Sequence, residues 1–391
     1  MLSANFTLGR FMLLAIIGGI AIGMGRVVTT FYALDKGATD AQIGYIAVCE
    51  AIGRLLVTLP AGFIIARYGA RRIYAISSLV PMLLNALMPW VNLWYTIALL
   101  RGLIALAVPF RVVSMNSAFL HYLSQVSVSR AGWYRGSQTF GMMILGPFLA
   151  SVLLGSVDYL WCYALIAALF GVMVFGSGNV LPGEAGATVQ PVRESSAESE
   201  ALGTQLKQLW HIPVVKEGCV IEFINSAINT VFTTFIIVLA VNALSLSKNQ
   251  AVSLLTLHGM AMVGASFVLG YLLNHFSLQG LQNASYVLSI LGLGLLGLVS
   301  NFAGLIAGAL MLACGSALVS LIKTLQLSKV SMDKGKISGV YNLFTISGSL
   351  VGALAGSILG QYQGLPCVFL MWLPILAGLL LWGICLGKRQ N

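Results

Sequence analysis

The chain of 391 residues is 58% apolar and only 8% charged, with a mean hydropathy of +0.93. Soluble domains carry roughly 25% charged residues. The composition therefore argues against a soluble enzyme, a secreted disulfide scaffold, a disordered regulator and a nucleic-acid-binding protein. It indicates an integral membrane protein that crosses the bilayer many times. The net charge of +10 has to be interpreted by position, because charges in the loops of such a protein report its orientation.

Runs of about 20 apolar residues, long enough to cross the hydrocarbon core as a helix, recur along the chain. The first six are expected at residues 11–33, 42–65, 73–91, 96–120, 137–156 and 159–181. The second six are expected at residues 218–242, 250–273, 281–299, 302–325, 339–360 and 366–386. The prediction is an all-α membrane protein with an N-terminal six-helix bundle (1–181), a linker (182–211) and a C-terminal six-helix bundle (212–391).

The linker is rich in serine, glutamate and glycine, a composition that cannot bury a hydrophobic core. We expect a flexible cytoplasmic tether. Residues 202–210 form either an unstructured part of it or a short amphipathic helix on the membrane surface.

Basic residues in the loops predict the orientation, because positive side chains accumulate on the cytoplasmic side. One set of loops carries only Lys36 and Lys248. The other set, together with both termini, is strongly basic, so both termini are expected in the cytoplasm, and no nucleic-acid partner is needed to explain the net charge. Lys323, near the cytoplasmic end of the tenth span, is expected to extend its ammonium group to the same interface. The basic residues of this side are Arg10, Arg67, Arg71, Arg72, Arg130, Arg135, Arg193, Lys207, Lys216, Lys329, Lys334, Lys336, Lys388 and Arg389.

The six cysteines lie singly in or near apolar spans and show no paired spacing. The sequence therefore predicts no disulfide framework, no metal site and no cofactor.

The two halves of the chain resemble each other weakly. A constant offset of 208 residues aligns Gln42 with Gln250 and Glu50 with His258 without a gap. Because each half has an even number of spans, the two halves have the same orientation. A parallel repeat of this kind predicts a substrate site near the bilayer midplane, between the two bundles.

The loop after the second span carries a glycine and arginine motif that reads GFIIARYGARR from Gly62. It resembles the G-x-x-x-D-R-x-G-R-[RK] motif of the major facilitator superfamily of secondary transporters, with Ala66 in place of the acidic residue and Ala70 in place of one arginine. The resemblance implies two pseudo-symmetric six-helix bundles and alternating access. It also implies a role in conformational change for four residues, and anchoring by positive charge is the alternative role. These residues are Gly62, Arg67, Gly69 and Arg71.

Two further elements resemble those of the same family. Arg101 is followed by Gly102 at the start of the fourth span, where the family often has an arginine followed by glycines. Gly146-Pro147 matches the beginning of a G-P-x-x-G-G element found in exporters, with small residues in place of the later glycines. A proline opens the helix backbone and small neighbours allow close packing. The element therefore indicates a bendable interface and favours export.

Ionisable side chains inside the first bundle are unbalanced. Each costs about 2.5–3.5 kcal/mol at a helix centre, so each needs a partner or a function. Arg26, Arg54, Arg101 and Arg111 face a single glutamate, Glu50. We expect the missing negative charge to come from a carboxylate or phosphate of the substrate, bound by Arg26 and Arg111 with Arg54 nearby. In the alternative interpretation Glu50 and Arg54, four residues apart on one helical face, form a structural pair.

The second bundle contributes Glu222 and His258, with Asn225 and Asn229 on roughly the same face of the seventh span as Glu222. A buried carboxyl group or imidazole can take up a proton on one side of the membrane and release it on the other. We expect Glu50, Glu222 and His258 to carry the coupling proton, and the two asparagines to bind substrate. A packing role is the alternative for His258.

These features predict a proton-driven secondary transporter. No His-Glu-x-x-His motif, serine–histidine arrangement or nucleotide-binding loop occurs in the sequence, which disfavours an intramembrane enzyme and direct use of ATP. Twelve spans in a parallel repeat disfavour a channel. The favoured prediction is efflux, by antiport, of a small anionic or zwitterionic metabolite, metallophore-like or drug-like. The alternative is a proton-coupled importer of a similar anion such as a siderophore. The expected partners are the small-molecule substrate, the proton and the lipid of the inner membrane, with the chain acting as a monomer.

Overall fold

The computed structural model describes residues 2–58, 60–123, 131–180, 212–328 and 334–390. Within these ranges all regular structure is helical. The chain divides into two compact units, described separately below. Unit 1 comprises Met1–Ala38 and Ile46–Glu200, and unit 2 comprises Thr39–Tyr45 and Ala201–Asn391. The expected linker at 182–211, with its amphipathic segment, lies outside the described residues.

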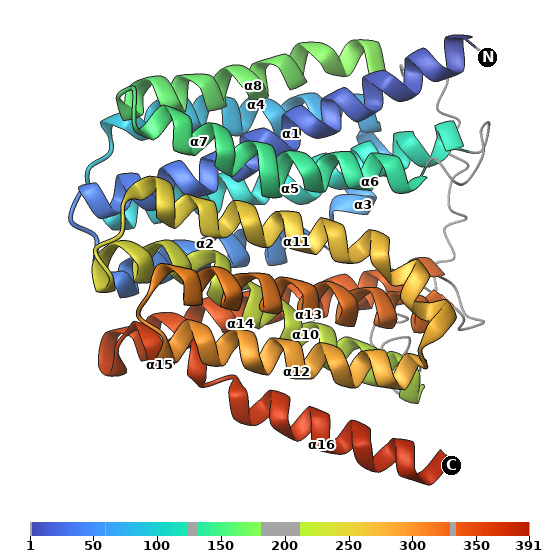
Figure 1. The fold of residues 1–391 in the computed structure, drawn as a ribbon. Helices are drawn as coiled ribbons and strands as arrows, with labels where there is room; N and C mark the ends of the chain where they lie inside the picture. Colours follow the sequence, from blue (N-terminus) through green and yellow to red (C-terminus); the bar gives the residue numbers. More distant parts are fainter. Residues whose placement is uncertain (1, 59, 124–130, 181–211, 329–333, 391) are drawn as a thin grey trace. The chain divides into compact units, whose positions relative to one another are not determined.

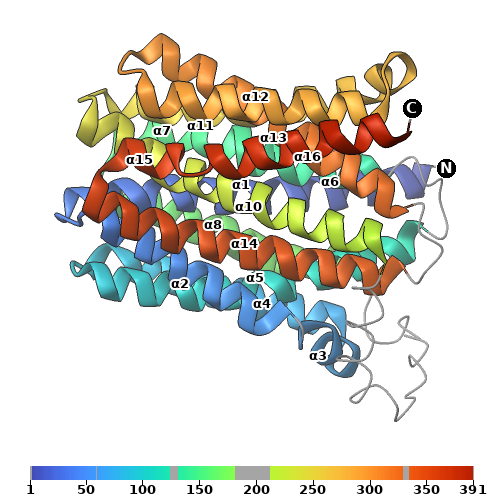
Figure 2. The same cartoon turned by 90° about the horizontal axis from the view of Figure 1, so that it is seen from below.

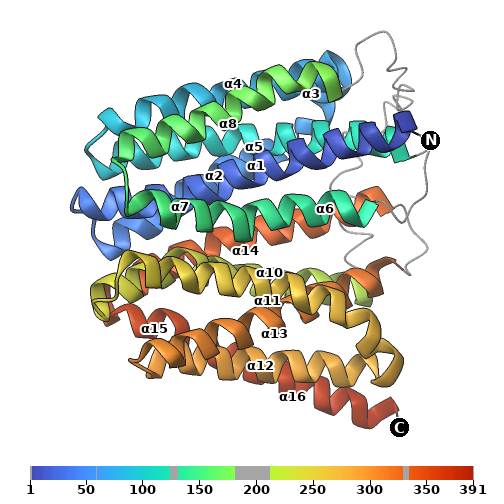
Figure 3. The ribbon, with the colours of Figure 1, turned by 45° about the horizontal axis from the view of Figure 1, so that its top comes forward.

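Unit 1 is built around α1, which packs against α8 and against the continuous helix formed by α6, η3 and α7 (Figure 3). Helix α4 packs against both α5 and α8. The helices, the last part of α2 included, are α1 (Leu2–Asp35), α2 (Asp40–Thr58), α3 (Ala61–Tyr68), α4 (Ala70–Leu87), the short η1 (Met88–Trp90), α5 (Trp94–Leu123), α6 (Ala131–Phe140), the π-helical turn η3 (Gly141–Leu145), α7 (Gly146–Leu154) and α8 (Tyr159–Val180).

In unit 2, α10 packs along α14 and also contacts α13, while α12 lies beside α13 and α16 (Figures 1 and 2). Helix α11 packs against α13. The helices are α10 (Pro213–Val238), the π-helical turn η4 (Leu239–Ala243), α11 (Lys248–His275), α12 (Leu278–Leu298), α13 (Phe302–Ser328), α14 (Lys334–Gln363), α15 (Leu365–Leu370) and α16 (Leu373–Gln390).

Within the described part of the chain, 11 segments are long and apolar enough to cross a membrane. They coincide with eleven of the twelve expected spans. The remaining expected span, at 250–273, coincides with the helix α11.

Two expected spans are interrupted next to prolines. Helix α2 ends at Thr58, and a separate short helix, α3, begins after Pro60, so the span expected at 42–65 ends earlier than predicted. The last expected span is likewise divided into α15 and α16, with Pro374 the second residue of α16. Proline lacks the N–H that a helix interior needs and clashes with the preceding turn, so a new helix starts at each position.

The internal repeat is visible in how two helices begin. At the start of α2 the Thr39 N–H donates to Gln42 Oε1 (2.9 Å) and the Gln42 N–H donates to Thr39 Oγ1 (3.4 Å). Ser247 and Gln250 exchange the same two bonds at the start of α11, at 3.0 and 3.3 Å. Both pairs are capping boxes. The two helices begin 208 residues apart, at residues 40 and 248, so the offset found in the sequence aligns local structure as well.

Helix α1 crosses the Gly146-Pro147 element at backbone contact. A Cβ atom on Gly19 would lie 2.5 Å from the Gln138 carbonyl oxygen, and one on Gly146 would lie 2.8 Å from the Met24 nitrogen. Pro147 has no N–H for the carbonyl one turn earlier, and the helix forms the π turn η3 immediately before the element. The element is thus a site of close helix packing.

Lys323 is buried, and the expectation that its ammonium group reaches the interface is wrong. Its side chain is 1% exposed, and Nζ donates to Glu217 Oε1 (2.6 Å), Gln282 Oε1 (3.0 Å) and Gln326 Oε1 (2.9 Å). These three acceptors satisfy all the donors of the ammonium group. The network ties α10, α12 and α13 together inside unit 2.

Helix α14 packs on α10 through its glycines. A Cβ atom on Gly352 would lie 2.8 Å from the Ala227 Cα atom, and one on Gly348 would overlap the carbonyl oxygen of Phe223. The obstacles are backbone atoms, which cannot move aside as the end of a side chain can. Close approach of this kind is typical of helix pairs in membranes.

Replacement of Gly352 by alanine is expected to destabilise unit 2 by about 1–3 kcal/mol, because the new methyl group forces the two helices apart. Gly264→Ala on α11 is a matched control, since its Cβ would have no atom within 4 Å. The control should be neutral or slightly stabilising, because alanine favours a helix. Thermal unfolding in detergent measures both. Equal melting temperatures for the two variants would contradict the close packing.

Candidate functional site

Unit 1 contains a cavity of about 200 Å³ lined by the charged side chains that the sequence places inside its spans. Arginines from three helices and one glutamate converge there, although they are far apart in the sequence. They are Arg26 on α1, Glu50 and Arg54 on α2, and Arg101 and Arg111 on α5. The structure therefore brings together the whole group of charges that the sequence analysis selected in the first bundle.

Glu50 forms an ion pair with Arg101 across the gap between α2 and α5. Arg101 Nη2 lies 2.5 Å and Nε 2.6 Å from Glu50 Oε1, and the two side chains are 8% and 17% exposed. Arg54 Nε instead donates to the backbone carbonyl oxygen of Glu50, at 3.4 Å. Helical side chains tilt toward the N-terminus, which brings Arg54 over that carbonyl. The carboxylate thus has a different partner from the one that the structural-pair interpretation gave it.

The cavity has more positive than negative charge. Four arginines and one glutamate line it, an excess of three positive charges. Arg111 is buried with its guanidinium carbon 5.0 Å from the centroid of the Phe170 ring, within the range of a cation–π contact. The aromatic face attracts the cation without neutralising it. Such a site favours a ligand with negative charge.

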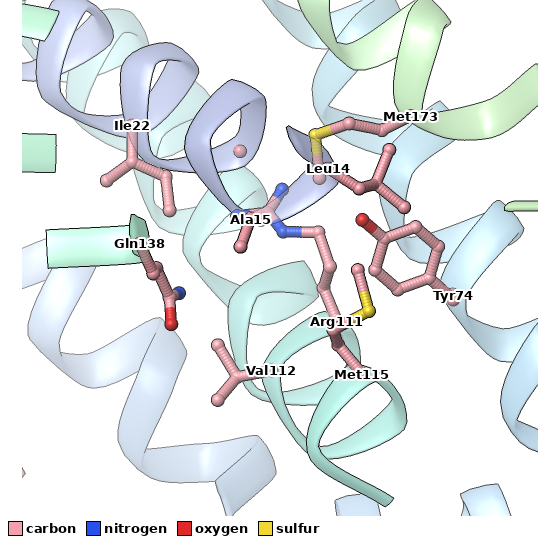
Figure 4. Close-up of a pocket in the computed structure, with 10 residues that line it drawn as sticks. Leu14, Ala15, Ile22, Tyr74, Arg111, Val112, Met115, Gln138 and Met173 are labelled. Carbon is pink, nitrogen blue, oxygen red and sulfur yellow. The ribbon is translucent and has the colours of Figure 1, made fainter. Parts of the chain in front are cut away.

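A second, smaller cavity of about 20 Å³ adjoins the first, and Arg111 lines both. Figure 4 shows the Arg111 side chain rising from α5 to place its guanidinium group next to Ala15, with Tyr74 on one side and Gln138 on the other. The guanidinium group therefore borders both spaces.

Two amide side chains that line the large cavity were missed by the sequence analysis. Asn85 of α4 is buried, and its Nδ2 donates to the Pro81 carbonyl oxygen at 2.7 Å. Gln138 of α6 lines both cavities. Asn85 could have been selected from the sequence, because it is an amide inside the apolar run at 73–91. A polar side chain within a membrane span is costly and therefore usually has a partner or a function.

The polar residues expected on α10 form a contiguous face inside unit 2. Glu222 is buried and accepts a hydrogen bond from the Tyr341 hydroxyl group at 2.7 Å. Asn225 Nδ2 donates to the Ser316 carbonyl oxygen at 3.4 Å, and Asn229 Nδ2 donates to the Asn225 carbonyl oxygen at 3.1 Å. The partner tyrosine was not foreseen, because its proximity depends on the packing of α14 on α10.

His258 is buried against α10 and α13. Its Nδ1 lies 3.1 Å from the Ala309 carbonyl oxygen, which makes Nδ1 the donor and leaves Nε2 as an acceptor. The ring stacks on Phe232 with centroids 4.2 Å apart. Among the described residues Nε2 has no hydrogen-bond partner. The stacking fits the packing alternative, and a buried Nε2 lone pair without a hydrogen bond among the described residues fits proton uptake. Among all the residues that the structure describes, no group of three or more acidic, histidine or cysteine side chains could hold a metal ion.

The loop motif joins α3 to α4. Gly69 has φ +84°, a backbone conformation that favours glycine. The Arg67 guanidinium group lies over the ring of Tyr68 (5.4 Å to the centroid), and that of Arg71 reaches α8, where a Cβ atom on Gly178 would be 2.8 Å from Nη2. Neither arginine forms a salt bridge with any residue that the structure describes.

Removal of either partner of the Glu50–Arg101 pair is expected to destabilise the protein by about 3–5 kcal/mol, because the other charge stays buried. Glu50→Gln and Arg101→Met should each melt well below the wild type, and the double variant should lose less than the sum. A double-mutant cycle on thermal unfolding in detergent measures the coupling. The cycle of Glu50→Gln with Arg54→Met is the control and should show weaker coupling. Strict additivity for the Arg101 cycle would contradict the pairing.

Two solved structures share the fold of this chain. A crystal structure of an aspartate-to-alanine variant of the nucleoside transporter NupG superposes with a TM-score of 0.81 at 13% identity, covering 97% of this chain and 99% of that one. A second crystal structure of NupG gives a TM-score of 0.79 at 15% identity, covering 98% and 99%. At these identities the likeness establishes the fold alone. No curated protein matches the sequence.

The sequence profile of the Major Facilitator Superfamily matches residues 7–331, which include the described part of unit 1 except the first residues of α1, and most of unit 2. Together with the helical fold and the membrane-crossing helices, this match confirms the family suggested by the loop motif. The protein is a multi-pass membrane transporter. The chain belongs to the Major Facilitator Superfamily.

Proposed function

We propose that the protein is a proton-coupled secondary transporter of a small organic anion, and that the anion binds in the cavity of unit 1. The observation that carries the proposal is the ring of four arginines around a single glutamate. The cargo would carry a carboxylate or phosphate group, alone or as part of a zwitterion.

The charge balance of the cavity supports an anionic cargo. Arg101 directs two N–H groups at one oxygen of Glu50, so the one carboxylate among the described residues that line the cavity is already engaged. Arg26 and Arg111 approach from α1 and α5. Burial of further positive charge is costly unless an anion compensates it. The planar guanidinium group is suited to binding carboxylate or phosphate through two parallel hydrogen bonds.

An uncharged nucleoside is the second candidate, favoured by the fold shared with NupG. In unit 2, Asn225 and Asn229 have amide groups of the kind that bind base edges. The ring of Phe232 stacks on that of His258. A nucleoside, being uncharged, would add no negative charge beside the four arginines that line the cavity. We therefore prefer the anion.

The electrostatics of the cavity favour cotransport of proton and anion. Protonation of Glu50 would remove the only negative charge among four arginines and so strengthen anion binding in the same cavity. By linkage, a bound anion would favour protonation of Glu50 to the same extent. Two ligands that promote each other's binding move together, and an inward proton gradient then drives import. We thus prefer the importer over the antiport efflux predicted from the sequence, for which the Gly146-Pro147 element is the supporting feature.

Glu222 is the second candidate proton carrier. Its carboxylate accepts a hydrogen bond from Tyr341, and protonation would weaken that contact between α10 and α14. His258 is the third, through its free Nε2. We propose that the protein acts as a monomer in the inner membrane.

Arg26→Gln and Arg111→Gln should each lower anion uptake about tenfold or more, because each removes charge-assisted hydrogen bonds to the cargo. Proteoliposomes given an acid-outside gradient and a panel of labelled mono- and dicarboxylates, sugar phosphates, adenosine and uridine provide the measurement. Arg72→Gln, which changes an exposed arginine outside the cavity, is the matched control. Normal anion uptake by both variants would exclude the proposed site. Uptake of the nucleosides alone would favour the second candidate.

Addition of the transported anion to the outside of such vesicles should acidify the lumen, because the proton enters with the cargo. Antiport would make the lumen alkaline and would restore the efflux prediction. Glu50→Gln should abolish acidification while the cargo still binds, since Arg101 is released from its pair. Glu222→Gln and His258→Phe, which keeps the ring stack, test the other candidates. Proton entry that persists after both glutamates are changed would exclude Glu50 and Glu222.

A further inference from the structure

Arg111 separates two spaces of different character within unit 1. The large cavity is lined by four arginines and one glutamate together with apolar side chains, whereas Arg111 is the one charged residue among the described residues that line the small one. We call the small one the side pocket. Besides the wall that it shares with the large cavity, it is lined by Leu14, Ala15, Gly18, Tyr74, Met115 and Met173. Figure 4 shows Leu14, Tyr74, Met115 and Met173 gathered on one side of the Arg111 guanidinium group.

The side pocket is closed by residues that are almost completely buried. Tyr74 is 1%, Met173 2% and Met115 3% exposed. The volume of about 20 Å³ is sufficient for one water-sized group and no more. Methionine side chains are flexible and fill irregular gaps. The walls can therefore adapt to a small apolar group that enters.

We propose that the side pocket is a specificity subsite that receives a short apolar arm of the cargo while Arg111 binds the adjacent carboxylate. This inference rests on the proposed function, because it assumes an anion at Arg111. It narrows the cargo to organic acids with a compact hydrocarbon substituent next to the acid group.

The two spaces differ in the number of charged side chains that a hydrocarbon arm would meet. The large cavity exposes Arg26, Arg54 and the Glu50–Arg101 pair, which an alkyl group would desolvate without compensation. The side pocket offers the thioethers of Met115 and Met173 and the side chain of Leu14. Transfer of each methylene group from water to such surroundings is favourable. The arm and the acid group thus separate on the two sides of the Arg111 guanidinium group.

Gly18 and Met173 set the depth of the side pocket. A Cβ atom on Gly18 would lie 3.0 Å from Met173 Cε and 3.6 Å from Met173 Sδ. The absence of a side chain at Gly18 therefore provides the space opposite the methionine. A methyl group there would shorten the side pocket, and truncation of Met173 would lengthen it.

The test is a calorimetric titration of the detergent-purified full chain with sodium acetate, propionate, butyrate, valerate and hexanoate. Each methylene that enters the side pocket should tighten binding about fourfold. In the wild type, affinity should rise with roughly one added carbon and then stop rising. Met173→Ala should extend the rise by roughly two further carbons, because it removes the thioether arm. Gly18→Ala should abolish the first rise.

Met24→Ala is the matched control, because Met24 is a fully buried methionine on α1 that lines neither cavity. It should keep the chain-length profile of the wild type. Opposite shifts in Met173→Ala and Gly18→Ala support the inference. If carboxylates bind in a manner that Arg111→Gln abolishes, but all profiles are the same, the arm lies elsewhere and the inference fails while the proposed function stands. If the wild type binds none of these acids at Arg111, the inference fails, and the uptake panel in proteoliposomes, which includes dicarboxylates and sugar phosphates, decides the proposed function separately. Gly18→Ala, the smaller change, decides the question should Met173→Ala not fold.

Discussion

A guanidinium group buried among membrane helices needs a counter-charge, and the described residues that line the cavity of unit 1 provide one carboxylate for four of them. The Glu50–Arg101 pair neutralises one arginine and leaves the cavity positive. This imbalance is the basis on which we propose an anionic cargo and cotransport with a proton. The cavity exists because α1, α2, α4, α5, α6 and α8 each contribute a polar or aromatic side chain to it. The rest of unit 1 holds those helices in place.

Close helix packing is what makes that positioning possible. The crossing of α1 with the helix around Gly146 brings backbone into contact with backbone, and the glycines of α14 do the same against α10 in unit 2. In lipid there is no hydrophobic force to drive helices together, so small residues and buried polar contacts hold them. In unit 2 the buried polar contacts include the Lys323 network, in which one ammonium group connects three helices.

The fold could be predicted from the sequence largely because apolar runs of the right length have few alternatives in a membrane. The helix breaks near Pro60 and Pro374 could also have been predicted from the sequence, since proline acts locally. The partners of the buried charges could not have been predicted in this way. Glu50 could bond Arg54 on its own helix or Arg101 on another, and only the packing of α2 against α5 decides between them. Lys323 shows the same limit, because its three acceptors come from residues 217, 282 and 326. Asn85 was the exception, a polar residue whose depth alone should have drawn attention.

The paired capping boxes fix where one ionisable residue lies along a helix in each half of the chain. Thr39 with Gln42 and Ser247 with Gln250 start α2 and α11 in the same way, and both helices then place their ionisable residue at the same distance from the cap, Glu50 in one and His258 in the other. At about 1.5 Å per residue, each lies about 15 Å along its helix. The two halves thus differ in the chemistry of this position and share the geometry of the helix that carries it. A carboxylate and an imidazole occupy equivalent positions along their helices. The two halves can therefore carry different ionisable groups at these positions without any change in helix length.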